Sequence, residues 1–537
     1  MKTAFWKIWV FILLILTGLT ILPFFQHIPS FNFNLLFDEH NLFGTTLLRT
    51  LIYGVTSSLL VVGFGFLGAL LLIRLPFSSA LGKNMSVLIL PVTLGDISIA
   101  FICNLLLGKT TLFSNIIEGG VTYQLAFLIM LQIWQYGLLF VYLFWLNFQS
   151  IPRVRIDYAI ANRFSFYQSI KDIYFPFSKN LFILLGAIAL VFSLYEEAKI
   201  SYLFKVSQGT NSELITNWLS RSYQSALLVN TDFARNLAFN GGFITALAAL
   251  LVMILFFVFI NSGSQLLIGS KIYFNCFKAK TKSMSGVSKK ISWFWALILV
   301  ALIVVPTAFS FTKFNFSTNA SLVELAFPLG MTFLSTIAAS AVAVFFGIAS
   351  RLGWKYLLST FSNRSVIFFF FLFLLMLIPP LVILISGFSW MGLIGYNSDG
   401  MIYAIWIIGH TILTLPILGS FVLVNHFRVT TNEINYLQVY GLSKPELVRL
   451  SFLFRFKAEY LLLFIIGFSF IWNEAVLNNL FSDYIPSFAS RLKMLITGRG
   501  ADYSLAFGYL LVSMSLAILA VFVWRYITDK AQKINVQ

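Results

Sequence analysis

Two ionisable side chains lie within long apolar segments of this sequence, where a charge is costly. Asp96 follows Gly95 in one apolar segment, and His410 precedes Thr411 in another. An ionisable group inside a membrane span usually marks a solute path, because hydrocarbon solvates charge poorly. Both residues are candidates for a translocation path, although we favour a hydrogen bond between packed helices for each.

Two acidic residues stand at matching ends of apolar segments. Glu197 lies in residues 195–198, Tyr-Glu-Glu-Ala, and Glu474 lies in residues 472–475, Trp-Asn-Glu-Ala, at an offset of 277 (474 − 197). The repeated position favours a shared role over two unrelated surface acids. A role in a gate at the outer face and a purely structural role are equally compatible with this pattern.

The other reactive side chains form no catalytic or metal-binding pattern. The four histidines and two cysteines lack the spacing of metal ligands. Gly108-Lys109-Thr110 resembles the end of a phosphate-binding loop, but Cys103 occupies the position of the first glycine of that motif. We therefore expect a chain that is not an enzyme, with no catalytic residue, no metal and no bound cofactor.

Residues 157–176 and residues 435–454 share one pattern at an offset of 278 (435 − 157). Each copy lies between two apolar segments. It begins with a triplet of residues, and after three further residues comes the position of a turn. Nine residues after the turn, the copy closes with an apolar end. The first copy contains Asp157, Tyr158, Ala159, Arg163, Phe164, Ile173 and Pro176. The second contains Asn435, Tyr436, Leu437, Gly441, Leu442 and Leu453.

This pattern suits a short amphipathic helix, a sharp turn and a return to the next span. Gly441 can supply the turn, because glycine tolerates positive φ, and Pro176 can stiffen the return. Apolar residues such as Ile160 and Phe164 follow helical spacing. The alternative is an amphipathic helix that lies on lipid. The recurrence of the pattern at the same spacing favours a docking element.

The pattern resembles the E-A-A-x3-G-x9-I-x-L-P loop of ABC-importer permeases. The chain is similar to the fused, binding-protein-dependent permeases of the thiamine and ferric-iron importer group. The resemblance implies a separate ATPase, in two copies that each grip one loop and bind the ATP. It also implies a periplasmic binding protein that delivers a small solute. Both copies depart from the pattern, with Arg163 for the glycine, Asn435 for the acid and Phe454 for the proline.

The composition predicts an all-α polytopic membrane protein. The chain is 59% hydrophobic and 10% charged, with a mean hydropathy of +0.89, whereas soluble domains carry about 25% charged residues. Backbone groups in lipid must pair within helices or closed barrels. Long unbroken apolar runs exclude a barrel, whose strands would alternate.

Twelve segments approach the roughly 20 residues that a span needs. They divide into two parallel repeats of six helices, with a first permease domain at 1–262, a basic cytoplasmic linker at 263–291 and a second permease domain at 292–537. The expected spans are 7–25, 47–73, 86–107, 125–147, 181–195, 237–260, 292–312, 329–350, 365–388, 402–424, 460–473 and 504–524.

The net charge of +17 orients the chain rather than attracting nucleic acid. Most of its 36 Lys and Arg residues fall in alternate loops, which by the positive-inside rule face the cytoplasm. Both termini are then cytoplasmic, in a bacterial inner membrane whose anionic lipid the basic loops contact. Cys103 and Cys276 are too far apart in this topology to form a disulfide.

An ABC-importer permease is therefore our preferred hypothesis for the function. A twelve-span secondary transporter would usually carry more charge within its spans, and it is the second hypothesis. A membrane enzyme or flippase is the third. Thiamine, ferric iron, polyamines and organic anions are all compatible with the sequence as transported solutes.

Overall fold

The computed structural model describes most of the helical segments of the chain. The described ranges are 42–76, 79–107, 120–149, 153–194, 198–204, 213–219, 288–312, 326–353, 399–426, 431–474 and 503–534, with short runs such as 240–245 and single residues such as Glu196 between them. The expected spans at 7–25 and 365–388, and most of the span at 237–260 and of the linker, lie outside the described residues.

The described residues form helices, and no strand occurs among them. The helices bounded within the described residues of the first half include α3 (Phe43–Leu71), α4 (Ala80–Asn84), η3 (Met85–Ile89), α5 (Leu90–Leu94), α6 (Asp96–Leu107), α8 (Val121–Gln132), η4 (Ile133–Gly137), α9 (Leu138–Gln149), α10 (Arg153–Ala161), α11 (Phe166–Ser169), η5 (Ile170–Tyr174), α12 (Phe175–Leu194) and α13 (Ala198–Leu203).

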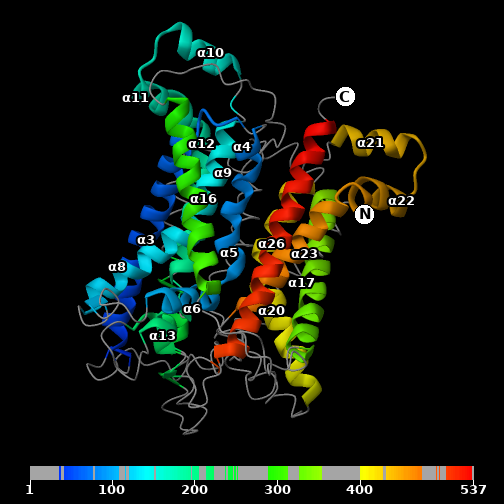
Figure 1. Ribbon diagram of the computed structural model, residues 1–537. Coiled ribbons are helices and arrows are strands. Elements are labelled where there is room, and N and C mark those ends of the chain that lie inside the picture. The colour runs from blue at the N-terminus through cyan, green and yellow to red at the C-terminus, as the bar shows by residue number, and fades with distance from the viewer. Residues whose placement is uncertain are drawn as a thin grey trace.

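The second half continues in the same manner (Figure 1). Its helices are α16 (Lys289–Thr312), α17 (Ala326–Gly353), α20 (Asp399–His426), α21 (Thr431–Val439), α22 (Lys444–Val448), η7 (Arg449–Phe454), α23 (Lys457–Asn473) and α26 (Tyr503–Ile534).

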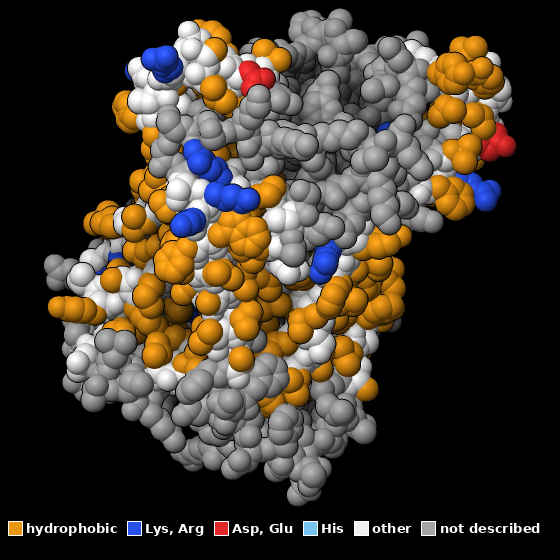
Figure 2. Space-filling view, turned by 45° about the horizontal axis from the view of Figure 1, so that its top comes forward, with side chains coloured by type: hydrophobic (Ala, Val, Ile, Leu, Met, Phe, Trp, Pro, Cys, Tyr) orange, Lys and Arg blue, Asp and Glu red, His pale blue; other side chains and the backbone are white. Residues whose placement is uncertain are grey.

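The helices are those of a membrane-embedded protein. Five described segments are long and apolar enough to span a bilayer, or six if one bent pair counts as a span. They are Phe43–Leu71, Val121–Gln149, Lys289–Pro306, Ala326–Ile348 and Ala506–Val523. Figure 2 shows hydrophobic side chains over the flanks of the molecule, with most of the visible Lys and Arg toward one end.

One expected span has a different shape. The span expected at 86–107 is covered by two helical segments, Met85–Leu94 and Asp96–Asn104, which are apolar enough together but meet at an angle of 95°. Gly95 lies at the break with φ 73° and ψ 168°. This backbone conformation is nearly restricted to glycine, so a glycine ends α5 and lets α6 begin at Asp96 in a new direction.

Helices pack within each half and also between the halves. Within the halves, α3 packs against α9 and α12, and α17 packs against α20 and α23. Helix α16 belongs to the second half by sequence, yet it packs on α3 and α6 of the first half. The Trp295 indole N–H donates to the Gly68 carbonyl at 3.1 Å, and the Ser292 hydroxyl donates to the Leu71 carbonyl at 2.6 Å.

Helix positions in the two halves differ by the offset that relates the two sequence copies. Residues 121–149, which form α8, η4 and α9, correspond to α20 at 399–426. Residues 153–161 of α10 correspond to residues 431–439 of α21, and both helices end at the same position. The first residues of these described helices therefore differ by the same 278 positions (399 − 121 and 431 − 153) as the two sequence copies.

Candidate functional site

The first repeated segment folds into a helical hairpin whose turn is closed by two backbone hydrogen bonds. The Phe164 N–H donates to the Ala159 carbonyl at 2.9 Å, and the Arg163 N–H donates to the Ile160 carbonyl at 3.1 Å. These two bonds define a Schellman motif at the end of α10. Arg163 has φ 52°, in the left-handed region that glycine usually occupies.

The second repeated segment has the same turn. The Leu442 N–H donates to the Leu437 carbonyl at 3.4 Å, and the Gly441 N–H donates to the Gln438 carbonyl at 3.1 Å. Gly441 has φ 81°, which is the positive φ that the sequence led us to expect of it. The hairpins thus share one backbone geometry, although arginine replaces glycine in the first.

Each turn is followed by a capping box at the start of the next helix. In the first hairpin the Ser165 N–H donates to Gln168 Oε1 at 2.9 Å, and the Gln168 N–H donates to Ser165 Oγ at 3.2 Å. In the second, the Ser443 N–H and hydroxyl donate to the Glu446 carboxylate at 2.9 Å and 2.7 Å. These bonds hold the pKa of the Glu446 carboxyl below its ordinary value.

The inner side of each hairpin is anchored by buried side chains. Ala159, Ile173 and Tyr174 are buried in the first hairpin. In the second, Leu437 packs against a small cluster that includes Phe452. Both hairpins then pass through a short π-helical segment, η5 or η7, toward a long apolar helix. The anchors hold the hairpins against the helix ends from which they project.

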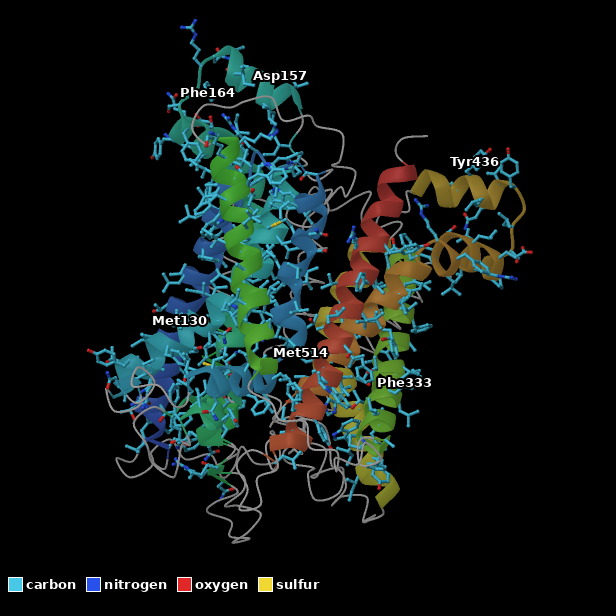
Figure 3. All side chains as sticks on the ribbon, viewed as in Figure 1. Met130, Asp157, Phe164, Phe333, Tyr436 and Met514 are labelled. Atoms are coloured by element: carbon cyan, nitrogen blue, oxygen red, sulfur yellow. The ribbon has the colours of Figure 1, made fainter. Side chains whose placement is uncertain are left out.

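The outer side of each hairpin exposes aromatic and aliphatic side chains. Tyr158 and Tyr167 are 61% and 74% exposed in the first hairpin, and Tyr436 and Val439 are 60% and 84% exposed in the second. Figure 3 shows Asp157 and Phe164 on one hairpin and Tyr436 on the other, at the same end of the molecule. This end therefore offers two separate apolar surfaces beyond the helical bundle.

The other predicted hairpin residues take different places. Phe164 is partly buried, and its ring packs edge-on against Tyr158 with 5.8 Å between ring centroids. Asp157, Asn435 and Pro176 are exposed, and Pro176 lies in the first turn of α12. Leu442 is partly buried, whereas Leu453 is 44% exposed.

Asp96, which is 33% exposed, contacts a group of buried charged and polar side chains that the sequence did not reveal. Lys199 Nζ lies 2.7 Å from Asp96 Oδ1 and 2.5 Å from Glu196 Oε2. The Gln132 side-chain amide donates to the same Glu196 oxygen at 2.7 Å. The Lys199 side chain has no solvent exposure, and its ammonium lies 5.8 Å from the centroid of the Tyr136 ring. Helices α6, α8 and α13 thus converge on Glu196.

His410 and Glu474 come together in the second half. His410 Nε2 lies 3.5 Å from Glu474 Oε2, with the imidazole fully buried. The ring Nδ1 lies 2.9 Å from the Trp406 carbonyl, which requires an N–H at Nδ1 for a hydrogen bond. A proton on Nε2 or on the Glu474 carboxyl would complete the contact between the two side chains.

The two polar contacts occupy corresponding positions. The offset from Gln132 to His410 is 278 (410 − 132), and the offset from Glu196 to Glu474 is also 278 (474 − 196). The residue that corresponds to Glu474 is therefore Glu196, whereas the sequence analysis paired it with Glu197, which lies outside the described residues. The offset of the hairpins, applied throughout, would have identified Glu196.

No family model, curated protein or solved structure matches this chain in the comparisons made. Within the described ranges, no group of His, Cys, Asp and Glu side chains could hold a metal ion.

Proposed function

We propose that this chain is the membrane permease subunit of an ABC importer, driven by a separate ATPase that grips the two hairpins. One observation carries the proposal: two hairpins with the same turn and the same capping position project from one end of the helical bundle. A helix that lies on lipid has no need for a second copy with matching hydrogen bonds. A symmetric ATPase dimer has two identical clefts, and it therefore needs two matching hairpins to fill them.

The charge distribution supports a cytoplasmic position for this end. Arg155, Arg163 and Lys171 belong to the first hairpin, and Lys289 and Lys290 begin α16 near the same end. Basic residues are retained on the cytoplasmic side of membrane proteins. Both termini are then cytoplasmic, in a bacterial inner membrane.

The full architecture that we propose has twelve spans in two parallel six-helix repeats. The offset between the two sequence copies relates α8 to α12 of the first half to α20 to α23 of the second. The domains run from 1 to 262 and from 292 to 537, with a basic linker between them. The partners are two ATPase copies, which bind the ATP, and a periplasmic protein that delivers a small solute.

A secondary transporter is the second candidate function, and the first half supplies the observation that favours it. The helix break at Gly95 places Asp96 beside a fully buried Lys199. Broken helices with buried charges hold substrates or coupling ions in many secondary transporters. The paired hairpins have no role in that mechanism, which is why we place it second.

Substitutions on the outer surface of the hairpins test the proposal. Val439→Asp and Tyr167→Asp each put a charge into an exposed apolar surface, so each should lower recovery of the ATPase with the tagged chain about tenfold. Tyr123→Asp is the matched control, because Tyr123 is 63% exposed near the start of α8, away from both hairpins. Equal ATPase recovery from all three variants would refute docking on the hairpins.

A further inference from the structure

We propose that the Gln132–Glu196 and His410–Glu474 pairs are two corresponding latches, which hold the far ends of α12 and α23 and open during transport. The inference rests on the proposed function, because an ATPase must supply the motion. It assigns a positioning role to Gln132, Glu196 and His410 in addition to Glu474.

Each latch lies at the far end of a helix that leads away from a hairpin. Helix α12 continues directly from η5, and α23 follows η7 after two residues. At about 1.5 Å per residue, α12 is roughly 30 Å long. Glu196 follows the last residue of α12 by two positions, and Glu474 directly follows α23. A displacement of either hairpin is therefore carried along one helix to one carboxylate.

Both carboxylates contact the preceding long helical segment at the same depth. Gln132 is the last residue of α8, 11 positions after Val121, and His410 is 11 positions after Asp399 in α20. Near the hairpins the same segments meet again, where the Asn147 amide of α9 donates to the Ser178 hydroxyl of α12 at 3.0 Å. If the hairpin end acts as the pivot, the latch end of α12 has to separate from α8.

The two latches differ in the further contacts that their side chains make. Glu196 also accepts the Lys199 backbone N–H at 3.2 Å, and the Lys199 ammonium continues to Asp96 at the helix break. The His410 ring is instead held by its own helix, at the Trp406 carbonyl. Glutamine in the first latch and histidine in the second both present a nitrogen to glutamate. Exchanging one for the other should therefore preserve the latch.

Reversible bridging tests whether the latches have to open. In a chain with Cys103→Ser and Cys276→Ser, cysteines would replace Gln132 and Glu196, or His410 and Glu474, and a short reducible bis-methanethiosulfonate would join them. The readout is ATP hydrolysis by the complex with its ATPase in lipid nanodiscs. Bridging either latch should lower hydrolysis about tenfold, since a blocked conformational step limits turnover, and a reductant should restore it.

The control joins the same two segments at the other end. Cysteines at Asn147 and Ser178, bridged by the same reagent, should leave hydrolysis unchanged, because the proposal places the pivot at this contact. Unchanged hydrolysis with both latches bridged would refute the proposal that the latches open, but it would not affect the proposal that the chain is an importer subunit. If no ATPase binds the chain at all, both proposals are refuted.

Single substitutions provide an independent check if a cysteine pair is inactive before bridging. His410→Gln should keep hydrolysis within about twofold of the wild type, because it recreates the pair of the first half. His410→Ala should lower hydrolysis about tenfold, because the cycle has to return to the closed state, in which Glu474 would lose this partner. Equal activity of the two variants, at equal thermal stability, would show that the contact with Glu474 has no part in turnover.

Discussion

At the residue scale, the hairpin turns show which features follow from spacing alone. The spacing singled out positions 163 and 441, and both residues have left-handed φ. The contact of Lys199 with Asp96 was missed, because it joins residues that lie far apart in the sequence. Glu196 lies only three residues before Lys199, but no local pattern predicts the second carboxylate, which comes from α6.

The left-handed turns predict opposite effects of substitution. A non-glycine residue costs roughly 1–2 kcal/mol in this conformation, so Arg163→Gly should raise the melting temperature of the detergent-solubilised chain and Gly441→Val should lower it. Gly441→Val should also weaken recovery of the ATPase while the protein still inserts. A lower melting temperature for Arg163→Gly would contradict the turn geometry.

The capping boxes predict a pH dependence confined to the second hairpin. Hydrogen bonds from Ser443 hold the pKa of Glu446 below its ordinary value. The bonds therefore stabilise the turn above the unfolded pKa, and this contribution is lost as the pH falls through the folded pKa. Amide exchange at Leu447, corrected for intrinsic rate, should accelerate in acid more than exchange at Ser169. Glu446→Gln should remove the difference.

At the element scale, apolar runs predicted where the helices lie better than they predicted where a helix bends. The expected spans 47–73, 402–424 and 460–473 match α3, α20 and α23 to within a few residues. The bend inside the span at 86–107 was not predicted, because hydropathy averages over the break. Gly95 was noted only as the neighbour of Asp96, and a single glycine does not reveal its φ.

Two glycines should respond in opposite ways to alanine. Gly95→Ala should destabilise the protein by about 1–3 kcal/mol, because alanine is strained at this backbone conformation. Gly63→Ala should be neutral or stabilising by up to about 1 kcal/mol, because Gly63 lies in α3 and an added methyl group would meet nothing within 4 Å. Thermal unfolding in detergent would compare the two, and a tolerated Gly95→Ala would argue against the break.

At the scale of the whole molecule, the common offset between the halves connects features that hydropathy cannot relate. It matches the hairpins, the helices around them and the two polar pairs. The sequence did not indicate that α16 packs on the first half, because its apolar surface has no partner-specific pattern. With that contact, the described helices pack into one bundle, and both hairpins lie at the same end of it.

The stoichiometry of the intact complex tests the central claim most directly. Native mass spectrometry of the tagged chain, released from lipid nanodiscs with its partners, should find two copies of one ATPase for each copy of this chain. The Val439→Asp variant should lose that ATPase, whereas Tyr123→Asp should keep it. Recovery of the chain alone, together with solute uptake that does not depend on ATP, would contradict the account.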